Sequence, residues 1–171
     1  MTSLRIRLAL RADLPCLTEI YNHYVVNTAI TFDIEPFTVE QRVSWFDLHA
    51  ETGRYRLLVA EDAGHLVGYA GTGPFRPKQA YETTVAATIY CAPDATGRGV
   101  GTRLYAALLD SLRGEDVHRA LAGITLPNPA SIALHQRFGF VEVGRFNENG
   151  RKLGRYWDVA WFEKRFAPES S

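Results

Sequence analysis

The sequence has few cysteines and no excess of charge of either sign. Its 171 residues include two cysteines, Cys16 and Cys91, which have no metal-ligand spacing and are too few for a disulfide scaffold. Lysine plus arginine and aspartate plus glutamate both number 19, so the formal net charge is zero. A nucleic-acid-binding protein usually carries a basic excess. We therefore expect packed, reduced thiols, no metal and no nucleic-acid partner.

Long hydrophobic runs are also absent. No apolar stretch approaches the roughly 20 residues that span a bilayer. The first ten residues alternate apolar side chains with Arg5 and Arg7, whereas a secretion signal has an uninterrupted apolar segment. These features predict a cytoplasmic protein with no membrane partner. With 46% hydrophobic and 22% charged residues, the chain is expected to form a single globular domain over residues 1–171.

Apolar periodicity predicts a mixed α/β domain with a twisted central sheet. Strands are expected at residues 4–10, 56–61, 66–73, 82–91, 117–125, 140–146 and 156–166. Four helices are expected to start near Asp13, Thr38, Val100 and Asn128. In the second of these, the inward-facing residues are expected to be Val43, Phe46 and Leu48. Residues 62–65 and Asn149-Gly150 are expected to form hairpin turns.

Alternating glycines follow the fourth expected strand. Gly97, Gly99 and Gly101 precede an apolar helical stripe, so main-chain N–H groups and a helix N-terminus can face one concavity. Such a loop binds an anion, most naturally a diphosphate. Thr102 and Arg103 occupy the place where a nucleoside triphosphatase has Lys-Ser/Thr, and the dinucleotide-binding pattern G-x-G-x-x-G is absent. From the loop alone, a glycine-rich strand-to-helix turn that binds no ligand is about as probable as an anion site, because short glycine motifs are weak evidence.

The spacing Thr96-x-x-Gly99-x-Gly101 resembles the acetyl-coenzyme A pyrophosphate loop of the GNAT N-acetyltransferases, usually Q/R-x-x-G-x-G/A. Thr96 stands where a long polar side chain is usual. The order of elements is similar to the GNAT fold over essentially the whole chain. Further stretches resemble the phosphinothricin and methionine sulfoximine acetyltransferase branch: Tyr21-Asn-His-Tyr24, Thr31-Phe32, Ala80-Tyr81, Thr84-Val85, Ile89-Tyr90, Leu126-Pro-Asn128, Ser131, Leu134-His135, Gly139-Phe140, Gly150-x-Lys152-x-Gly154 and Asp158.

This resemblance implies a twisted mixed central β-sheet flanked by about four helices, with acetyl-CoA as cosubstrate. It implies that the main chain of Ile89, Tyr90 and Cys91 pairs with the pantetheine arm and that Asn128 contacts the cofactor. The residues expected to cradle the pyrophosphate are Thr96, Gly97, Arg98, Gly99, Val100, Gly101 and Thr102.

The resemblance also places a catalytic residue at His135, where many GNAT enzymes have a tyrosine that protonates the departing thiolate. Histidine suits this step because its unperturbed pKa lies near neutrality. A histidine on an otherwise apolar helix is also commonly a packing residue. The substrate-binding residues that follow from the resemblance and from the loop composition are Phe32, Arg76, Lys78, Tyr81 and Thr84.

One position departs from the branch pattern. The branch has T-V-E where this chain has Thr84-Val85-Ala86, so the glutamate proposed as the base is missing. Water could carry the proton to His135 or to a distant acid, the acceptor could be a weaker base, or catalysis could be impaired.

The sequence therefore predicts an acetyl-CoA-dependent N-acetyltransferase for a small amino-acid-like amine, such as phosphinothricin or methionine sulfoximine, that acts by direct attack. The alternatives are another acceptor (a polyamine, an aminoglycoside or a protein amine) or a catalytically impaired acyl-CoA-binding module. A homodimer is expected from the resemblance. Its interface could use the aromatic residues of the last strand, Tyr156, Trp157, Trp161 and Phe162.

Overall fold

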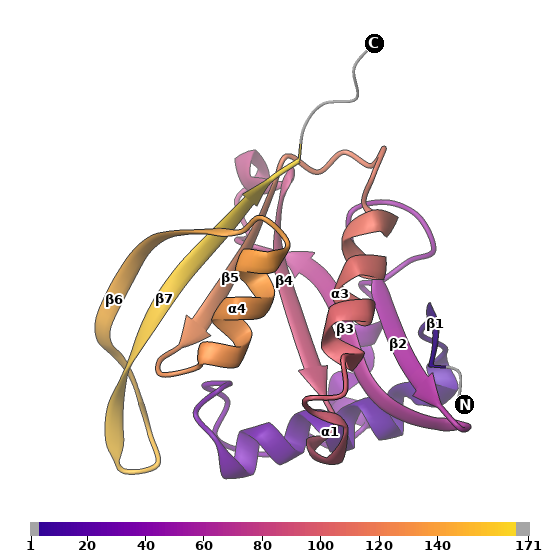
Figure 1. The fold of residues 1–171 in the computed structure, drawn as a ribbon, viewed down its shortest axis with the longest axis horizontal. Helices are drawn as coiled ribbons and strands as arrows, with labels where there is room; N and C mark the ends of the chain where they lie inside the picture. The colour runs from indigo at the N-terminus through magenta and orange to yellow at the C-terminus, as the bar shows by residue number, and fades with distance from the viewer. Residues whose placement is uncertain (1–3, 167–171) are drawn as a thin grey trace.

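The structure, a computed structural model, describes residues 4–166, so the two ends of the expected domain lie outside the described residues. Its strands form one sheet in the order β1-β2-β3-β4-β5-β7-β6. They are β1 (Arg5–Leu8), β2 (Leu57–Asp62), β3 (His65–Pro74), β4 (Thr84–Cys91), β5 (Arg119–Thr125), β6 (Val141–Lys152) and β7 (Arg155–Arg165). The long β6–β7 hairpin lies at the edge opposite β1 (Figure 1). The expected sheet and the hairpin of β2 with β3 are confirmed.

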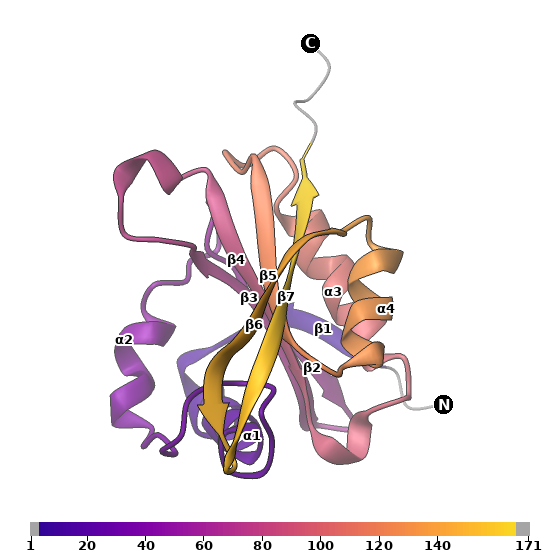
Figure 2. The same cartoon turned by 90° about the vertical axis from the view of Figure 1, so that its left-hand side faces the viewer.

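Helices cover both faces of this sheet. Figure 2 shows α1 (Leu14–Asn27) and α2 (Val43–Phe46) on one side, and α3 (Val100–Ser111) and α4 (Pro129–Arg137) on the other. α3 turns a stripe of buried residues toward the sheet because its apolar side chains recur every three or four positions. The expected fold, a mixed sheet with about four helices, is confirmed.

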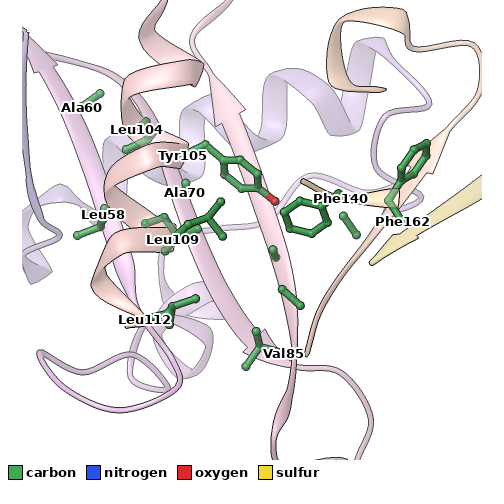
Figure 3. Close-up of a cluster of buried hydrophobic side chains, with 14 of the residues drawn as sticks. Leu58, Ala60, Ala70, Val85, Leu104, Tyr105, Leu109, Leu112, Phe140 and Phe162 are labelled. Carbon is green, nitrogen blue, oxygen red and sulfur yellow. The ribbon is translucent and has the colours of Figure 1, made fainter. Parts of the chain in front are cut away.

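The main core lies between α3, α4 and the sheet (Figure 3). Tyr105 of α3 stacks on Phe140 with ring centroids 5.8 Å apart, and both side chains are almost completely buried. Phe162 of β7 is also fully buried. The expectation that Phe162 contributes to a dimer interface is therefore wrong, because its side chain faces the core. A second cluster packs under α1 and contains Leu17, Ile20, Leu57, Val59 and Tyr69.

The parallel strands β4 and β5 separate soon after they meet. Their pairing extends only over Thr84–Ala86 and Arg119–Leu121. Beyond these residues β4 remains paired with β3 up to Cys91, and β5 remains paired with β7 up to Thr125. The two strands therefore leave an opening in the middle of the sheet, where one side of each strand lacks its ladder partner.

Helices begin near all four expected residues, and two of the three expected side-chain caps form. Asn128 accepts a hydrogen bond from Ser131 N at 3.1 Å and caps α4. Thr38 and Gln41 form the expected capping box, although the helix is only a short turn followed by α2. Asp13 does not cap α1: its carboxylate accepts from Leu10 N at 2.7 Å and pairs with Arg7. Because α1 is preceded by a tight turn over Arg11–Asp13, Asp13 sits inside the helical segment.

Leu48 is 48% exposed, so its expected inward orientation is wrong.

The β6–β7 turn lies at Leu153-Gly154, and the expected turn at Asn149-Gly150 is wrong. Leu153 and Gly154 have φ of 52° and 76°, as a two-residue hairpin turn requires. Gly150 instead lies within β6, next to a shift in the register of the β6–β7 pairing. A close contact, not a turn, requires glycine at this position. A Cβ on Gly150 would lie 2.1 Å from Cε2 of Phe32, so only glycine permits this close approach.

Candidate active site

Within residues 4–166, the glycine loop leads into a helix N-terminus that no side chain caps. Gly97 and Gly99 have φ of 73° and 78°, and a Cβ on either would meet nothing within 4 Å. Gly99 is the N-cap of α3 and makes no side-chain capping hydrogen bond. The first N–H groups of α3 therefore point outward with the positive end of the helix dipole. This arrangement fits the diphosphate of acetyl-CoA.

The loop's polar side chains are engaged elsewhere. The Thr96 hydroxyl donates to Pro93 O at 3.1 Å, and the Arg98 guanidinium pairs with the Asp62 carboxylate at 2.8 Å. Val100 is buried. The donors that the loop offers to an anion are thus mainly main-chain N–H groups, whose direction is set by Gly97 and Gly99.

The end of β4 presents main-chain groups to the opening. Ala92 N donates to Val67 O of β3 at 2.9 Å. Main-chain N–H and C=O groups point to opposite sides of a strand at successive residues, so those of Tyr90 also point toward β3. The main chains of Ile89 and Cys91 therefore face the opening. The Cys91 carbonyl accepts from the Tyr24 hydroxyl at 2.5 Å. Of the three residues expected to pair with the pantetheine arm, Ile89 and Cys91 have the matching orientation.

His135 lies in the core between α3 and α4. It is 3% exposed, and its ring is 5.0 Å from that of Tyr105 and 5.1 Å from that of Phe140. Nδ1 lies 2.8 Å from Ser131 O, so it carries the proton and Nε2 keeps its lone pair. Nε2 has no hydrogen-bond partner among residues 4–166. Burial lowers the pKa of His135. These surroundings agree with the packing alternative, and the catalytic role stays a prediction.

The opposite face of the sheet carries a floor of small side chains. Tyr90 packs on this face against Tyr21 of α1, with ring centroids 5.2 Å apart, so Ala86 and Thr88 also point to it. Their cross-strand partners on β3 are Gly73 and Gly71. Thr88 is exposed, whereas Gly71 is buried, with Leu57 Cδ1 3.1 Å and His49 Nε2 3.5 Å from the position that its Cβ would occupy.

An aromatic wall borders this floor at the closed end of the opening. Tyr81 packs edge-on against Phe75 at 5.7 Å, and Phe75 packs edge-on against Trp161 at 6.0 Å. The Arg76 guanidinium lies 5.1 Å from the Phe75 ring. Thr84 shares the face of Ala86, and Lys78 is exposed in the loop. Phe75 and Trp161 were missed as site residues because only the contacts of Phe75 with Tyr81 and of Trp161 with Phe75 identify them.

A second wall is formed by the loop between α1 and α2. Phe32 of this loop lies on Gly150 of β6. Lys152, which is buried, donates from Nζ to Thr31 O at 2.8 Å, and burial lowers the pKa of Lys152. The Tyr21 hydroxyl contacts Thr31 Oγ1 at 2.8 Å and also Asp33. The loop that carries Phe32 is thereby fixed to both α1 and β6.

Beneath this region lies a buried arginine that the sequence analysis did not single out. Arg42 is 5% exposed, and its guanidinium lies 3.9 Å from the Trp45 ring and 4.5 Å from the Tyr21 ring. It donates to Leu17 O at 3.2 Å. It follows the capping box directly in the sequence, and only the folded arrangement of α1 and α2 reveals its burial.

Comparison with known proteins identifies the family. A model of the acetyltransferase (GNAT) family matches residues 17–140. Phosphinothricin N-acetyltransferase from Streptomyces coelicolor is 56% identical over 94% of this chain and 95% of its own length. An L-methionine sulfoximine/L-methionine sulfone acetyltransferase from Pseudomonas aeruginosa is 38% identical over 94% of this chain and 93% of its own.

A solved structure has the same fold. The GNAT superfamily phosphinothricin acetyltransferase from Sinorhizobium meliloti, in complex with acetyl-CoA, superposes with a TM-score of 0.90. It is 34% identical, and the match covers 96% of this chain and 89% of the other. The chain belongs to the GNAT family, as the sequence predicted. It is an N-acetyltransferase with acetyl-CoA as its cosubstrate.

Two kinds of feature are absent from the described residues. From residue 4 to residue 166, no helix is long and apolar enough to cross a membrane. The same part of the chain contains no group of three or more histidine, cysteine, aspartate or glutamate side chains placed to hold a metal ion.

We expect Gly99→Ala to weaken acetyl-CoA binding about tenfold, because a Cβ disfavours the left-handed backbone by about 1 kcal/mol or more and misdirects the first N–H groups of α3. Calorimetric titration with acetyl-CoA measures this effect. Gly53→Ala is the matched control, since Gly53 also has a positive φ of 90° and open space around it but lies outside the loop. Equal affinity of both variants would exclude the loop as the diphosphate site.

We expect His135→Gln to reduce the loss of stability in acid. Burial lowers the folded-state pKa of His135, so its stabilising contribution is complete above the unfolded-state value of about 6.5 and is lost as the pH falls through that value. Urea unfolding between pH 7.5 and 5 should give a steeper decline of the unfolding free energy for the wild type than for His135→Gln. The exposed His118 provides a control, and His118→Gln should decline like the wild type. Parallel curves for all three proteins would contradict this expectation.

Proposed function

We propose that the chain transfers the acetyl group of acetyl-CoA to the amine of a small amino-acid-like acceptor such as phosphinothricin or methionine sulfoximine. The observation that carries this proposal is the opening between β4 and β5. The unpaired N-terminus of α3 lies on one side of the sheet, and the floor of Ala86, Thr88, Gly71 and Gly73 lies on the other. The activities named for the similar Streptomyces and Pseudomonas enzymes support the acceptor class.

In this proposal the chain holds and orients both reactants. The α3 N-terminus and residues 96–102 bind the diphosphate, Asn128 contacts the cofactor beside α4, and the main chain of Ile89 aligns the pantetheine arm. Acetyl-CoA supplies an acyl group already activated as a thioester. The acceptor amine attacks it directly from the floor, and positioning of the two groups supplies much of the rate enhancement.

A cysteine-linked acyl enzyme is disfavoured by the surroundings of Cys91. Its Sγ packs near Gly101 on the α3 side of the sheet, away from the floor. Burial raises the pKa of the Cys91 thiol, so little of the nucleophilic thiolate is present near neutral pH.

Acceptor recognition is assigned to the two walls. Phe32 and Tyr81 contribute apolar surface, and Thr84 lies on the same face as the floor. Arg76 and Lys78 are exposed in the loop beside the aromatic wall and bind the acidic group of the acceptor. In this scheme the neutral His135 takes up the second proton of the amine at Nε2 and passes it to the departing sulfur.

A thiol-release assay with acetyl-CoA and a panel of amines tests the proposal. We expect turnover with phosphinothricin and methionine sulfoximine. The double variant Arg76→Ala/Lys78→Ala should raise the KM for these acceptors about tenfold, because it removes two cations, and leave the KM for acetyl-CoA unchanged. Arg113→Ala is the control, since Arg113 is an exposed arginine that follows the C-terminus of α3. Turnover confined to polyamines, aminoglycosides or protein amines would contradict the proposed acceptor class and assign one of these amines in its place. Binding of acetyl-CoA without turnover on any amine would favour the binding-module alternative.

We also propose a homodimer that forms through the β6–β7 hairpin. β6 is an edge strand of the sheet, and Val141, Val143, Phe146 and Tyr156 on the hairpin are each more than half exposed. An exposed edge strand with apolar side chains is suited to pairing with a second copy. Tyr156 from the expected interface set remains a candidate, and the cytoplasmic location stays a prediction.

Replacing Val143 and Phe146 with glutamate should convert the dimer to monomers, because each charge would have to be desolvated in the interface. Sedimentation velocity over a range of protein concentrations measures the association state. Val26→Glu is the matched control, since Val26 is 53% exposed on α1 and lies outside the hairpin. A wild-type protein that sediments as a monomer at all concentrations would overturn the proposed dimer.

A further inference from the structure

The floor of the acceptor side has no group of its own that can remove a proton. A primary amine of ordinary pKa is largely protonated near neutral pH and must lose a proton before it attacks. The side chains at Gly71, Gly73, Ala86 and Thr88 contain no ionisable group. A base for this step must therefore reach the floor from an element that packs over it.

We propose that His49 is this base and that it accepts the amine proton directly or through one water molecule. The inference rests on the proposed function. Nε2 of His49 lies 3.5 Å from the position that a Cβ of Gly71 would occupy, so the imidazole stands over this glycine. Gly71 is the cross-strand partner of Thr88, and the next pair of residues on this face is Gly73 with Ala86. Paired strand residues are about 5 Å apart, so Nε2 borders the floor at a distance that one water can bridge.

The imidazole is held in a defined orientation. Its Nδ1 lies 3.2 Å from Phe46 O, which accepts a hydrogen bond when Nδ1 carries the proton; in this tautomer Nε2 has the lone pair needed to accept another. The Trp45 ring packs edge-on against it with centroids 5.0 Å apart, and His49 N donates to Phe46 O at 3.1 Å. His49 is half-buried, so part of the ring remains accessible.

The charges around His49 favour the neutral ring. Burial lowers its pKa, and the nearby Arg42 guanidinium acts in the same direction. The main-chain carbonyls of Phe46, Trp45 and Thr72 act in the opposite direction. From β4, the neighbouring Thr88 and Ala86 add no charge. A neutral imidazole at neutral pH is the form that can accept a proton.

Two carboxylates are rival bases. Glu163 of β7 pairs with Leu121 of β5, and Leu121 pairs with Ala86 of β4. Paired residues share a face of the sheet, so Glu163 lies on the same face as Ala86, two strands away. Asp33 lies in the exposed loop after α1, in contact with the Tyr21 hydroxyl. His49 is favoured because it lies over the immediate neighbour of Thr88, with no intervening strand.

The amine loses two protons during the reaction, one to His49 and one to the departing sulfur. The ammonium gives one proton to Nε2 of His49, and the freed lone pair forms the C–N bond as the C–S bond breaks. The second nitrogen proton goes to the departing sulfur. The imidazolium then releases the first proton to solvent, so the net products are the amide, the free thiol of coenzyme A and one proton.

The test compares wild type, His49→Gln, Glu163→Gln, Asp33→Asn and His49→Gln/Ala86→Glu in the thiol-release assay with phosphinothricin from pH 6 to 10. We expect His49→Gln to lower kcat about a hundredfold at pH 7 and progressively less toward pH 10, where the amine loses its proton unaided. The KM for acetyl-CoA should not change. Ala86→Glu should restore part of the activity, because it places a carboxylate on the floor. Glu163→Gln should behave like the wild type.

An active wild type with undiminished His49→Gln activity at pH 7 would overturn the inference, as would a loss of equal size at every pH, which marks a structural role. A selective loss in Glu163→Gln or Asp33→Asn would move the base to that carboxylate. Circular dichroism and acetyl-CoA affinity check that His49→Gln folds, and His49→Asn provides a second variant of different length. A wild type with no turnover on any amine would overturn the proposed function and this inference together.

Discussion

The separation of β4 from β5 after three paired residues is the constraint on which the rest of the site depends. Each strand keeps its other neighbour, because β4 stays on β3 and β5 stays on β7. The opening therefore costs the hydrogen bonds of one ladder only, and it leaves polar main-chain groups that require a partner. A ligand with amide groups of its own, such as a pantetheine arm, satisfies such groups in the manner of an added strand.

The same separation divides the chemistry between the two faces. On the α3 side the side chains around Gly101 are apolar, with Ile89, Cys91 and Leu134 in van der Waals range of its Cβ position. The polar donors on that side are concentrated at the α3 N-terminus. On the other side, a floor of small residues is enclosed by walls that come from β6, β7 and two loops. Anion binding and amine binding can thus be optimised separately because the sheet lies between them.

The sequence predicted the elements better than their tertiary contacts. Periodicity was sufficient to locate the strands and α3, and the Asn128-Pro129 pair was sufficient for the cap of α4, because these features depend on neighbours within a few residues. It misplaced the β6–β7 turn, since Gly150 is explained by Phe32, which lies more than a hundred positions earlier in the chain. The roles of Phe75 and His49 could not be predicted for the same reason. Phe75 contacts Trp161 of β7, and His49 contacts Gly71 of β3, and neither partner is close in the sequence.

The charge balance around the acceptor side bears on the choice of acceptor. Arg42 and Lys152 are both buried, and each donates to a main-chain carbonyl, Leu17 O and Thr31 O respectively. Neither makes a salt bridge within residues 4–166, and Asp33, which acts on Lys152 through its charge, is exposed. With Arg76 and Lys78 at the rim, this region has an excess of cations although the chain is neutral overall. Such a field attracts an acceptor with an acidic group and repels a polyamine or an aminoglycoside, so electrostatics favours the amino-acid-like acceptors over the polycationic ones.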